Sequence, residues 1–127
     1  MIKLKRAYDP ASPDDGYRVL VDRLWPRGIA KADLKIDCWE KDLGPSTELR
    51  KWFGHDPARW SAFSERYLQE LDDPEKQRLL ESLAGRARHD TVTLIYSARD
   101  TEHNQAVVLR QVVDQIIERG TGHSPAS

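Results

Sequence analysis

Two short polar segments contain residue types that bind anions and transfer protons. The first, DRLWPRG at residues 22–28, supplies the candidates Asp22, Arg23, Trp25 and Arg27. The second, SARDTEHN at residues 97–104, supplies Ser97, Arg99, Asp100, His103 and Asn104. Guanidinium groups recognise phosphate and carboxylate, and hydroxyls, imidazoles and carboxylates act as nucleophiles, acids or bases. The two segments therefore predict a site for a small anion, with Arg23, Trp25, Arg27, Arg99, Asp100 and Asn104 as ligand-binding candidates.

Proton transfer at such a site would fall to Asp22, Ser97 and His103, the candidate catalytic residues. Ser97 stands where a turn from strand to helix can present a nucleophilic hydroxyl, with His103 as its base and Arg99 beside the developing charge. Against this hypothesis, YSARD does not match the GxSxG pattern of esterases and lipases. His103 also falls in a predicted first helical turn, where a cation is disfavoured. For this segment, anion binding without chemistry is the favoured alternative.

The residues of the first segment also have structural explanations. The carboxylate of Asp22 can accept hydrogen bonds from loop amides. Arg23 and Arg27 can stack on Trp25 or pair with an internal carboxylate. Trp25 itself is more typical of a core or corner aromatic than of a ligand platform. The sequence leaves a functional and a structural role open for each of these residues.

Each polar segment follows an apolar run that predicts a strand. Residues 17–25 are rich in Val and Leu without alternation, as in a strand covered on both faces, and residues 91–97 are a β-branched run. Apolar residues at helical spacing over 104–119 then predict a helix with Thr101 or Asn104 as its N-cap. Sites in open α/β sheets form beyond the carboxyl ends of the strands. If the two strands are parallel and adjacent, both polar segments converge on one cavity.

The other predicted elements are two short strands and a series of capped helices. Ile2 and Leu4 alternate with lysines in a half-buried strand, and residues 34–38 suit a short strand or an extended segment. Ser46 caps a predicted helix before Gly54, and Asp-Pro pairs at 56–57 and 73–74 open two more. The aromatic residues at core spacing are Trp52, Phe53, Trp60, Phe63 and Tyr67. An exposed part of this group would mark a homodimer interface or a lid.

Strands interleaved with helices predict an α/β fold with a mostly parallel sheet flanked by helices. The length of 127 residues fits a single compact domain. We place this domain over residues 1–119. Residues 120–127, GTGHSPAS, are small and polar and predict a flexible C-terminal tail.

Composition argues against several classes of function. With 20 Lys and Arg against 21 Asp and Glu, the net charge is −1, so no overall field attracts nucleic acid or an anionic membrane. Neither a membrane-spanning run nor the apolar stretch of a signal peptide is present. The single cysteine, Cys38, allows no internal disulfide and no CxxC metal pair, which fits the cytoplasm. Phosphate-binding glycine motifs are missing and the histidines lack ligand spacing, so no cofactor or metal is expected.

The strings VLVDRLWPRGI and LIYSARDTEHNQAVVL resemble the YeaO-like family of small bacterial proteins, a domain-of-unknown-function group. The resemblance runs from Ile2 to about Val113 and implies a compact α/β domain without a settled activity. It also implies that the candidates named above, with Pro26 and Gly28, match the family's shared motifs. Other branches of the wider family resemble this chain but carry a cysteine near the position of Ser97. The serine argues against thiolate chemistry of the rhodanese or cysteine-phosphatase kind.

Three function classes follow. The first is an enzyme, a hydrolase or transferase, acting on a small phosphorylated or carboxylated molecule held by Arg23, Arg27 and Arg99. It predicts arginines without internal partners. The alternative is a non-catalytic module that senses a metabolite or docks on a protein, and it predicts engaged arginines and an exposed patch around Trp52 and Trp60. Nucleic-acid binding is the weakest class, because the near-zero net charge supplies little affinity.

Overall fold

A parallel sheet of four strands forms the centre of the structure, a computed structural model that describes residues 1–123. The strands are β1 (Ile2–Arg6), β2 (Tyr17–Leu20), β3 (Cys38–Trp39) and β4 (Val92–Tyr96), in the order β1-β4-β2-β3. Each neighbouring pair is parallel. The predicted α/β class with a parallel sheet is confirmed. The central position of β2 and β4 brings their carboxyl ends together.

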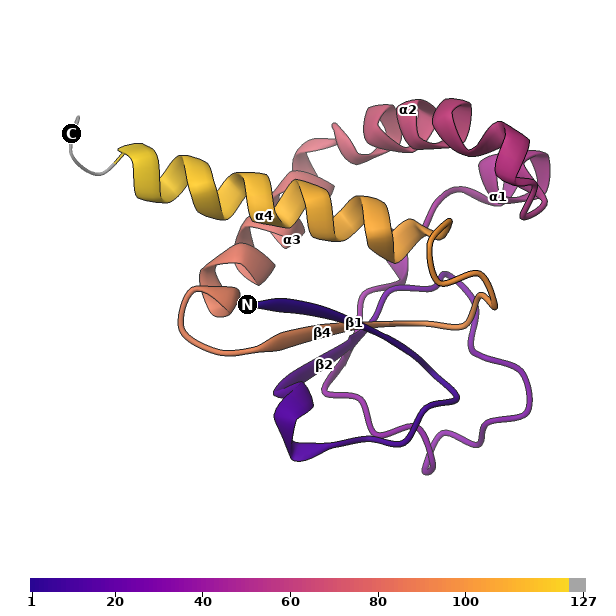
Figure 1. Ribbon diagram of the computed structural model, residues 1–127, viewed down its shortest axis with the longest axis horizontal. Coiled ribbons are helices and arrows are strands. Elements are labelled where there is room, and N and C mark those ends of the chain that lie inside the picture. The colour runs from indigo at the N-terminus through magenta and orange to yellow at the C-terminus, as the bar shows by residue number, and fades with distance from the viewer. Residues whose placement is uncertain (124–127) are drawn as a thin grey trace.

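The α-helices lie together on one side of the sheet (Figure 1). They are α1 (Thr47–Phe53), α2 (Trp60–Leu71), α3 (Pro74–Ala87) and α4 (Gln105–His123). The predicted caps of α1 and α3 are confirmed: Ser46 Oγ accepts from the Leu49 amide, and the Asp73 carboxylate accepts from two amides of the first turn. Asp56 instead caps the 3₁₀ turn Pro57–Arg59, and α2 begins after it.

The two faces of the sheet are covered in different ways. Val19 and Leu94 point to the helices and join the main core. Leu20 and Ile95, the next residues along β2 and β4, point to the other face and pack with Leu34. Successive residues of a strand alternate between faces, and all four strand residues are fully buried. This confirms the prediction that β2 is covered on both faces and shows the same for β4, although the second cover comes from the segment 24–39, which is irregular up to β3, rather than from a helix.

Some element boundaries differ from the prediction. β2 ends at Leu20 rather than at Trp25, because the chain turns away from the sheet after Asp22. The Trp39 indole stabilises this turn by donating to Asp22 O at 2.7 Å. β3 is two residues long and lies at the end of the predicted 34–38 segment. α4 continues to His123, beyond the predicted end at 119. The rest of the predicted tail, residues 124–127, lies outside the described residues. Among residues 1–123, none of the helices combines the length and the apolar character that spanning a membrane requires.

Candidate functional site

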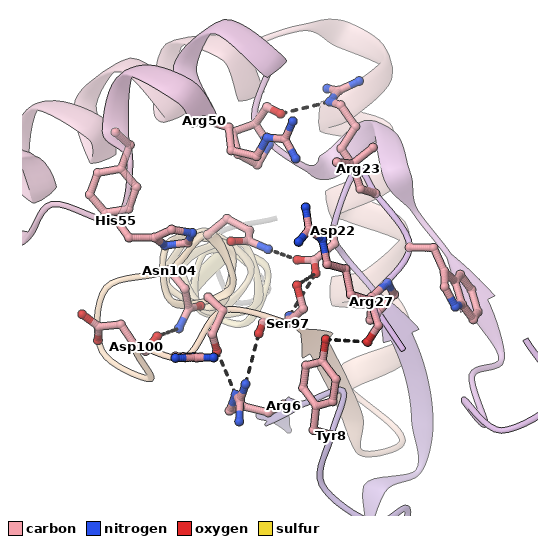
Figure 2. A pocket seen from close by; sticks show the side chains of 18 of the residues that line it. Arg6, Tyr8, Asp22, Arg23, Arg27, Arg50, His55, Ser97, Asp100 and Asn104 are labelled. Carbon is pink, nitrogen blue, oxygen red and sulfur yellow. Dashed lines mark hydrogen bonds between the residues drawn. The ribbon is translucent and has the colours of Figure 1, made fainter. Parts of the chain in front are cut away.

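A cavity of about 950 Å³ opens at the carboxyl ends of β2 and β4. The two strands continue to pair at this end, since the Val21 amide donates to Ile95 O at 3.0 Å. Residues from both polar segments surround the cavity together with residues of α1 and the loop after it (Figure 2). The sequence candidates among its lining residues are Asp22, Arg23, Trp25, Arg27, Ser97, Arg99, Asp100 and Asn104. Of the nine candidates, only His103 is not a lining residue.

Asp22 is a buried carboxylate in the wall of this cavity, with 8% of the residue exposed. Its Oδ2 accepts from the Ser97 amide at 2.9 Å and from Ser97 Oγ at 2.5 Å, and its Oδ1 accepts from Gln105 Nε2. Burial raises the pKa of Asp22, although these hydrogen bonds and the nearby charge of Arg50 act in the opposite direction. Asp22 is therefore fully hydrogen-bonded, but no cation touches it within the described residues.

Ser97 and His103 do not form a nucleophile–base pair. The Ser97 hydroxyl donates to Asp22. His103 Nδ1 lies 2.9 Å from Asp100 Oδ2, and its ring meets Trp60 edge-on with 5.3 Å between centroids. Asp100 also accepts from the amides of Glu102 and His103, and these bonds hold its pKa below the usual range. His103 thus belongs to a local turn, and Asp22 is the only sequence candidate for a base that touches Ser97.

Two arginines of the wall have structural roles. Arg23 turns away from Asp22 and donates to Pro45 O and Gly44 O, both at 2.9 Å (Figure 2). A Cβ at Gly44 would lie 2.8 Å from the Arg23 backbone nitrogen, so this close approach requires glycine. Arg6 donates to Ser97 O at 3.2 Å and to Ala98 O at 2.9 Å. Both guanidinium groups stabilise loop carbonyls that helices or strands leave unpaired.

Three other arginines line the cavity without a hydrogen-bond or ion-pair partner among the described residues. Arg27 and Arg99 are exposed, and Arg50 of α1 is half-buried. Within residues 1–123, their guanidinium groups make no hydrogen bond, ion pair or aromatic contact. Arg50 was not a sequence candidate, because an arginine in a short amphipathic helix is typical of a solvated face. Arg27 and Arg99 match the expectation of arginines free of internal partners, whereas Arg23 does not.

Trp25 and Asn104 are fixed by local contacts. Trp25 Nε1 donates to Ile29 O at 2.6 Å, and its ring packs edge-on against Trp39 with 5.3 Å between centroids. Asn104 is buried, its Oδ1 accepts from the Val107 amide at 3.2 Å, and its Nδ2 donates to Asp100 O at 2.9 Å. Asn104 is therefore the N-cap of α4. It places the first turn of this helix, which begins at Gln105, in the cavity wall.

The remaining wall is largely apolar and was missed by the sequence reasoning. It contains Tyr8, Leu24 and Pro45, with Phe53 and Phe63 from α1 and α2. The two phenylalanines show core spacing in the sequence, and a residue with a core role gives no separate signal for lining a cavity. His55 also lines it and adopts a positive φ of 58° directly after Gly54.

The aromatic helices do not form an open patch. The Trp52 ring lies under two guanidinium groups, those of Arg59 at 5.1 Å and Arg66 at 4.1 Å. Trp60 is half-buried and packs on Phe53 and Phe63. The exposed patch that a docking module would require around Trp52 and Trp60 is absent from the described residues. No group of three or more potential metal ligands occurs among them either.

Comparison with known proteins finds relatives of unknown activity. A family model described as the inactive DUF488-N3 subclade matches residues 1–127. The chain is 51% identical over 108 residues to the uncharacterised protein YeaO of Escherichia coli, covering 85% of this chain and 92% of that protein. It is 42% identical over 113 residues to uncharacterised proteins of Mycobacterium tuberculosis and Mycobacterium bovis, covering 89% of this chain and 93% of each. No solved structure matches.

Proposed function

The chain belongs to the inactive DUF488-N3 subclade and to the family of YeaO, and from this premise we propose that it binds a small anion without transforming it. The observation behind the proposal is the set of three unpartnered guanidinium groups, Arg27, Arg50 and Arg99, around one cavity. Arg50 is half-buried, and a partly buried guanidinium group in a folded protein is usually paired, whereas Arg27 and Arg99 are exposed at the rim of the same cavity. A phosphate or carboxylate is the partner that a guanidinium group binds most strongly, through charge-assisted and often bidentate hydrogen bonds.

The charge balance of the wall supports an anion. Five arginines and two aspartates are among the described lining residues. Asp22 is hydrogen-bonded to Ser97 and Gln105, and Asp100 to its own turn, so neither carboxylate neutralises an unpartnered arginine directly. The first turn of α4 adds the partial positive charge of a helix N-terminus. The cavity therefore attracts negative charge although the whole chain has a net charge of −1.

Binding is favoured over catalysis for two reasons. The described residues offer no imidazole in contact with Ser97, and His103, the base expected from the sequence, is bound to Asp100. The family description of the subclade as inactive points in the same direction.

The second candidate function is a hydrolase or transferase with Ser97 as nucleophile and Asp22 as base. The contact between Ser97 Oγ and Asp22 Oδ2 at 2.5 Å favours it, because a carboxylate with a raised pKa can accept the hydroxyl proton as the oxygen attacks. Turnover of an activated phosphate or carboxylate ester that Ser97→Ala abolishes in a folded protein would establish this function in place of simple binding.

The proposal is tested by isothermal titration with phosphate, sulfate and acetate at low ionic strength. The variants are Arg27→Ala, Arg50→Gln and Arg99→Ala, with Arg119→Ala as control, because Arg119 is exposed on α4, has no contact in the described residues and does not line the cavity. A charged hydrogen bond is worth about 1.5–3 kcal/mol, so each cavity variant should weaken binding roughly tenfold or more.

The control separates a site from a general charge effect. Arg119→Ala should bind the anion as the parent does. A saturating anion at about a hundred times its Kd should also stabilise the parent by about 2.7 kcal/mol in thermal unfolding. The proposal fails if none of these anions binds, or if Arg119→Ala loses as much affinity as the cavity variants.

A further inference from the structure

The cavity is much larger than an inorganic anion requires. Its volume of about 950 Å³ lies in the range of about 300–1,000 Å³ that is typical of pockets for drug-sized molecules. Such pockets combine apolar walls with a few polar groups that orient the ligand. Here the orienting groups are the guanidiniums of Arg27, Arg50 and Arg99. Apolar side chains make up much of the rest, so a phosphate ion alone would leave that surface in water.

Exposed apolar side chains gather at this cavity. The described residues include four exposed large hydrophobic side chains, those of Met1, Tyr8, Leu24 and Leu68. Two of them line the cavity: Leu24 is 57% exposed and Tyr8 is 46% exposed. Contiguous exposed apolar patches rimmed by polar groups mark interaction sites, ligand-binding grooves among them.

Tyr8 is held in place at the same cavity. Its hydroxyl donates to Arg27 O at 3.0 Å, and the Arg6 guanidinium lies 5.0 Å from its ring centroid (Figure 2). The ring is therefore fixed beside the segment that carries Arg27. This arrangement offers a flat apolar surface close to an unpartnered cation.

The inner apolar wall is rigid. Phe53 and Phe63 are stacked with 4.3 Å between centroids, and both are nearly fully buried. Because their packing is set by the core, they back the cavity wall with a fixed layer and expose little surface of their own. A preformed wall favours a ligand of matching shape, since little ordering entropy is lost on binding.

We propose that the ligand of this cavity is an organic anion in which a phosphate or carboxylate is attached to an apolar ring. The anionic group binds Arg27, Arg50 and Arg99, and the ring packs against Leu24 and Tyr8. This inference rests on the proposed function, because it names the class of anion for the same site. The arginines recognise the charge, and the exposed apolar residues distinguish an aromatic anion from an inorganic one.

The test compares anions with and without a ring. Phenyl phosphate is titrated against inorganic phosphate, and benzoate against acetate, by isothermal calorimetry. We expect each aromatic anion to bind at least tenfold more tightly than its ringless partner. Leu24→Ser should remove most of that preference. Leu68→Ser is the matched control, because Leu68 is 47% exposed on α2 but does not line the cavity.

The outcomes separate this inference from the function on which it rests. If ringless and aromatic anions bind equally, and Arg50→Gln weakens both, the anion site stands and the aromatic class is wrong. If the ring preference exists but Leu24→Ser and Leu68→Ser reduce it alike, the ring does not bind at this cavity and the inference is wrong. If none of the four probes binds, the proposed function fails and this inference fails with it.

Discussion

A buried aspartate lies at each end of the sheet, and the two differ in whether they form ion pairs. At the amino end of β2, Asp15 forms ion pairs with Lys5 Nζ at 3.1 Å and with Arg18 Nη1 at 2.5 Å. At the carboxyl end of the same strand, Asp22 accepts hydrogen bonds from Ser97 and Gln105 but has no ion pair. Both residues are less than a tenth exposed. The two carboxylates are similarly inaccessible to solvent, and they differ in that only Asp15 has cationic partners within ion-pair distance.

The pKa values of the two aspartates move in opposite directions. Burial alone would raise the pKa of Asp15, but hydrogen bonds from the Ser12 amide, Lys5 and Arg18 outweigh it and lower the pKa. For Asp22 burial prevails and the pKa is raised. Cations are present at both ends, but in the described residues Arg27, Arg50 and Arg99 make no hydrogen bond or ion pair, and Arg50 acts on Asp22 through its charge alone. At the amino end of β2, Lys5 and Arg18 are thus paired with Asp15. At the carboxyl end, the three cavity arginines form no ion pair within the described residues.

The largest expected effect comes from Asp15→Asn. The substitution removes the charge between Lys5 and the buried Arg18, and breaking a buried ion pair costs about 3–5 kcal/mol. Urea denaturation at pH 7 measures the loss, with Asp22→Asn as the matched variant at the other end. Equal losses in the two variants would mean that the two ends do not differ in the way their charges are paired.

A smaller loss is expected from Arg23→Ala. It leaves the Gly44 and Pro45 carbonyls without their donor, and hydrogen bonds to a charged group contribute about 1.5–3 kcal/mol. The free energy of unfolding from urea titration checks this value. Unchanged stability would show that Arg23 is as available to a ligand as Arg27.

The pH dependence of stability sharpens the comparison of the two aspartates. In the unfolded chain Asp22 ionises near its ordinary pKa of 3.8, whereas in the folded chain it ionises at a higher pH. The parent therefore loses stability relative to Asp22→Asn as the pH rises from 3.8 through the folded pKa. Gln105 can rotate its amide to bond the new asparagine, so the hydrogen bonds persist.

Above pH 3.8 we expect Asp22→Asn to have a higher free energy of unfolding than the parent, by less than the losses expected for Asp15→Asn and Arg23→Ala. Below pH 3.8 we expect no difference between Asp22→Asn and the parent. Unfolding free energies measured from pH 3 to pH 8 provide the check. The ionisation of Asp15 changes stability with pH in the opposite direction. Its lowered pKa contributes stability above pH 3.8, and this stability is lost as the pH falls through the pKa of the folded state. An advantage of Asp22→Asn that grows toward low pH would contradict the raised pKa of Asp22.

The smallest effect on stability is expected from Arg27→Ala and Arg99→Ala. Both residues are exposed and make no side-chain contact in the described residues, so each change should stay within about 0.5 kcal/mol. Thermal unfolding without added anion measures it. A loss as large as that of Arg23→Ala would place these arginines among the structural ones.

Local sequence patterns specify the scaffold and the end of the sheet at which the cavity opens. The apolar runs of β2 and β4 specify strands buried on both faces, and the caps at Ser46, Asp73 and Asn104 specify where helices begin. These features depend on neighbours along the chain, so local patterns are sufficient to find them. The convergence of two polar segments followed from the rule for parallel sheets.

Only the tertiary structure decided which charged groups are used by the fold. Arg23 and Arg27 lie in the same short segment, yet Arg23 reaches carbonyls 21 and 22 residues away, while the Arg27 guanidinium has no partner among residues 1–123. Arg50 joins the cavity from a separate helix, and His103 is drawn to Asp100 and Trp60 instead. A guanidinium or imidazole pairs with whatever acceptor folding brings within about 3 Å, and residue type and spacing do not contain that distance.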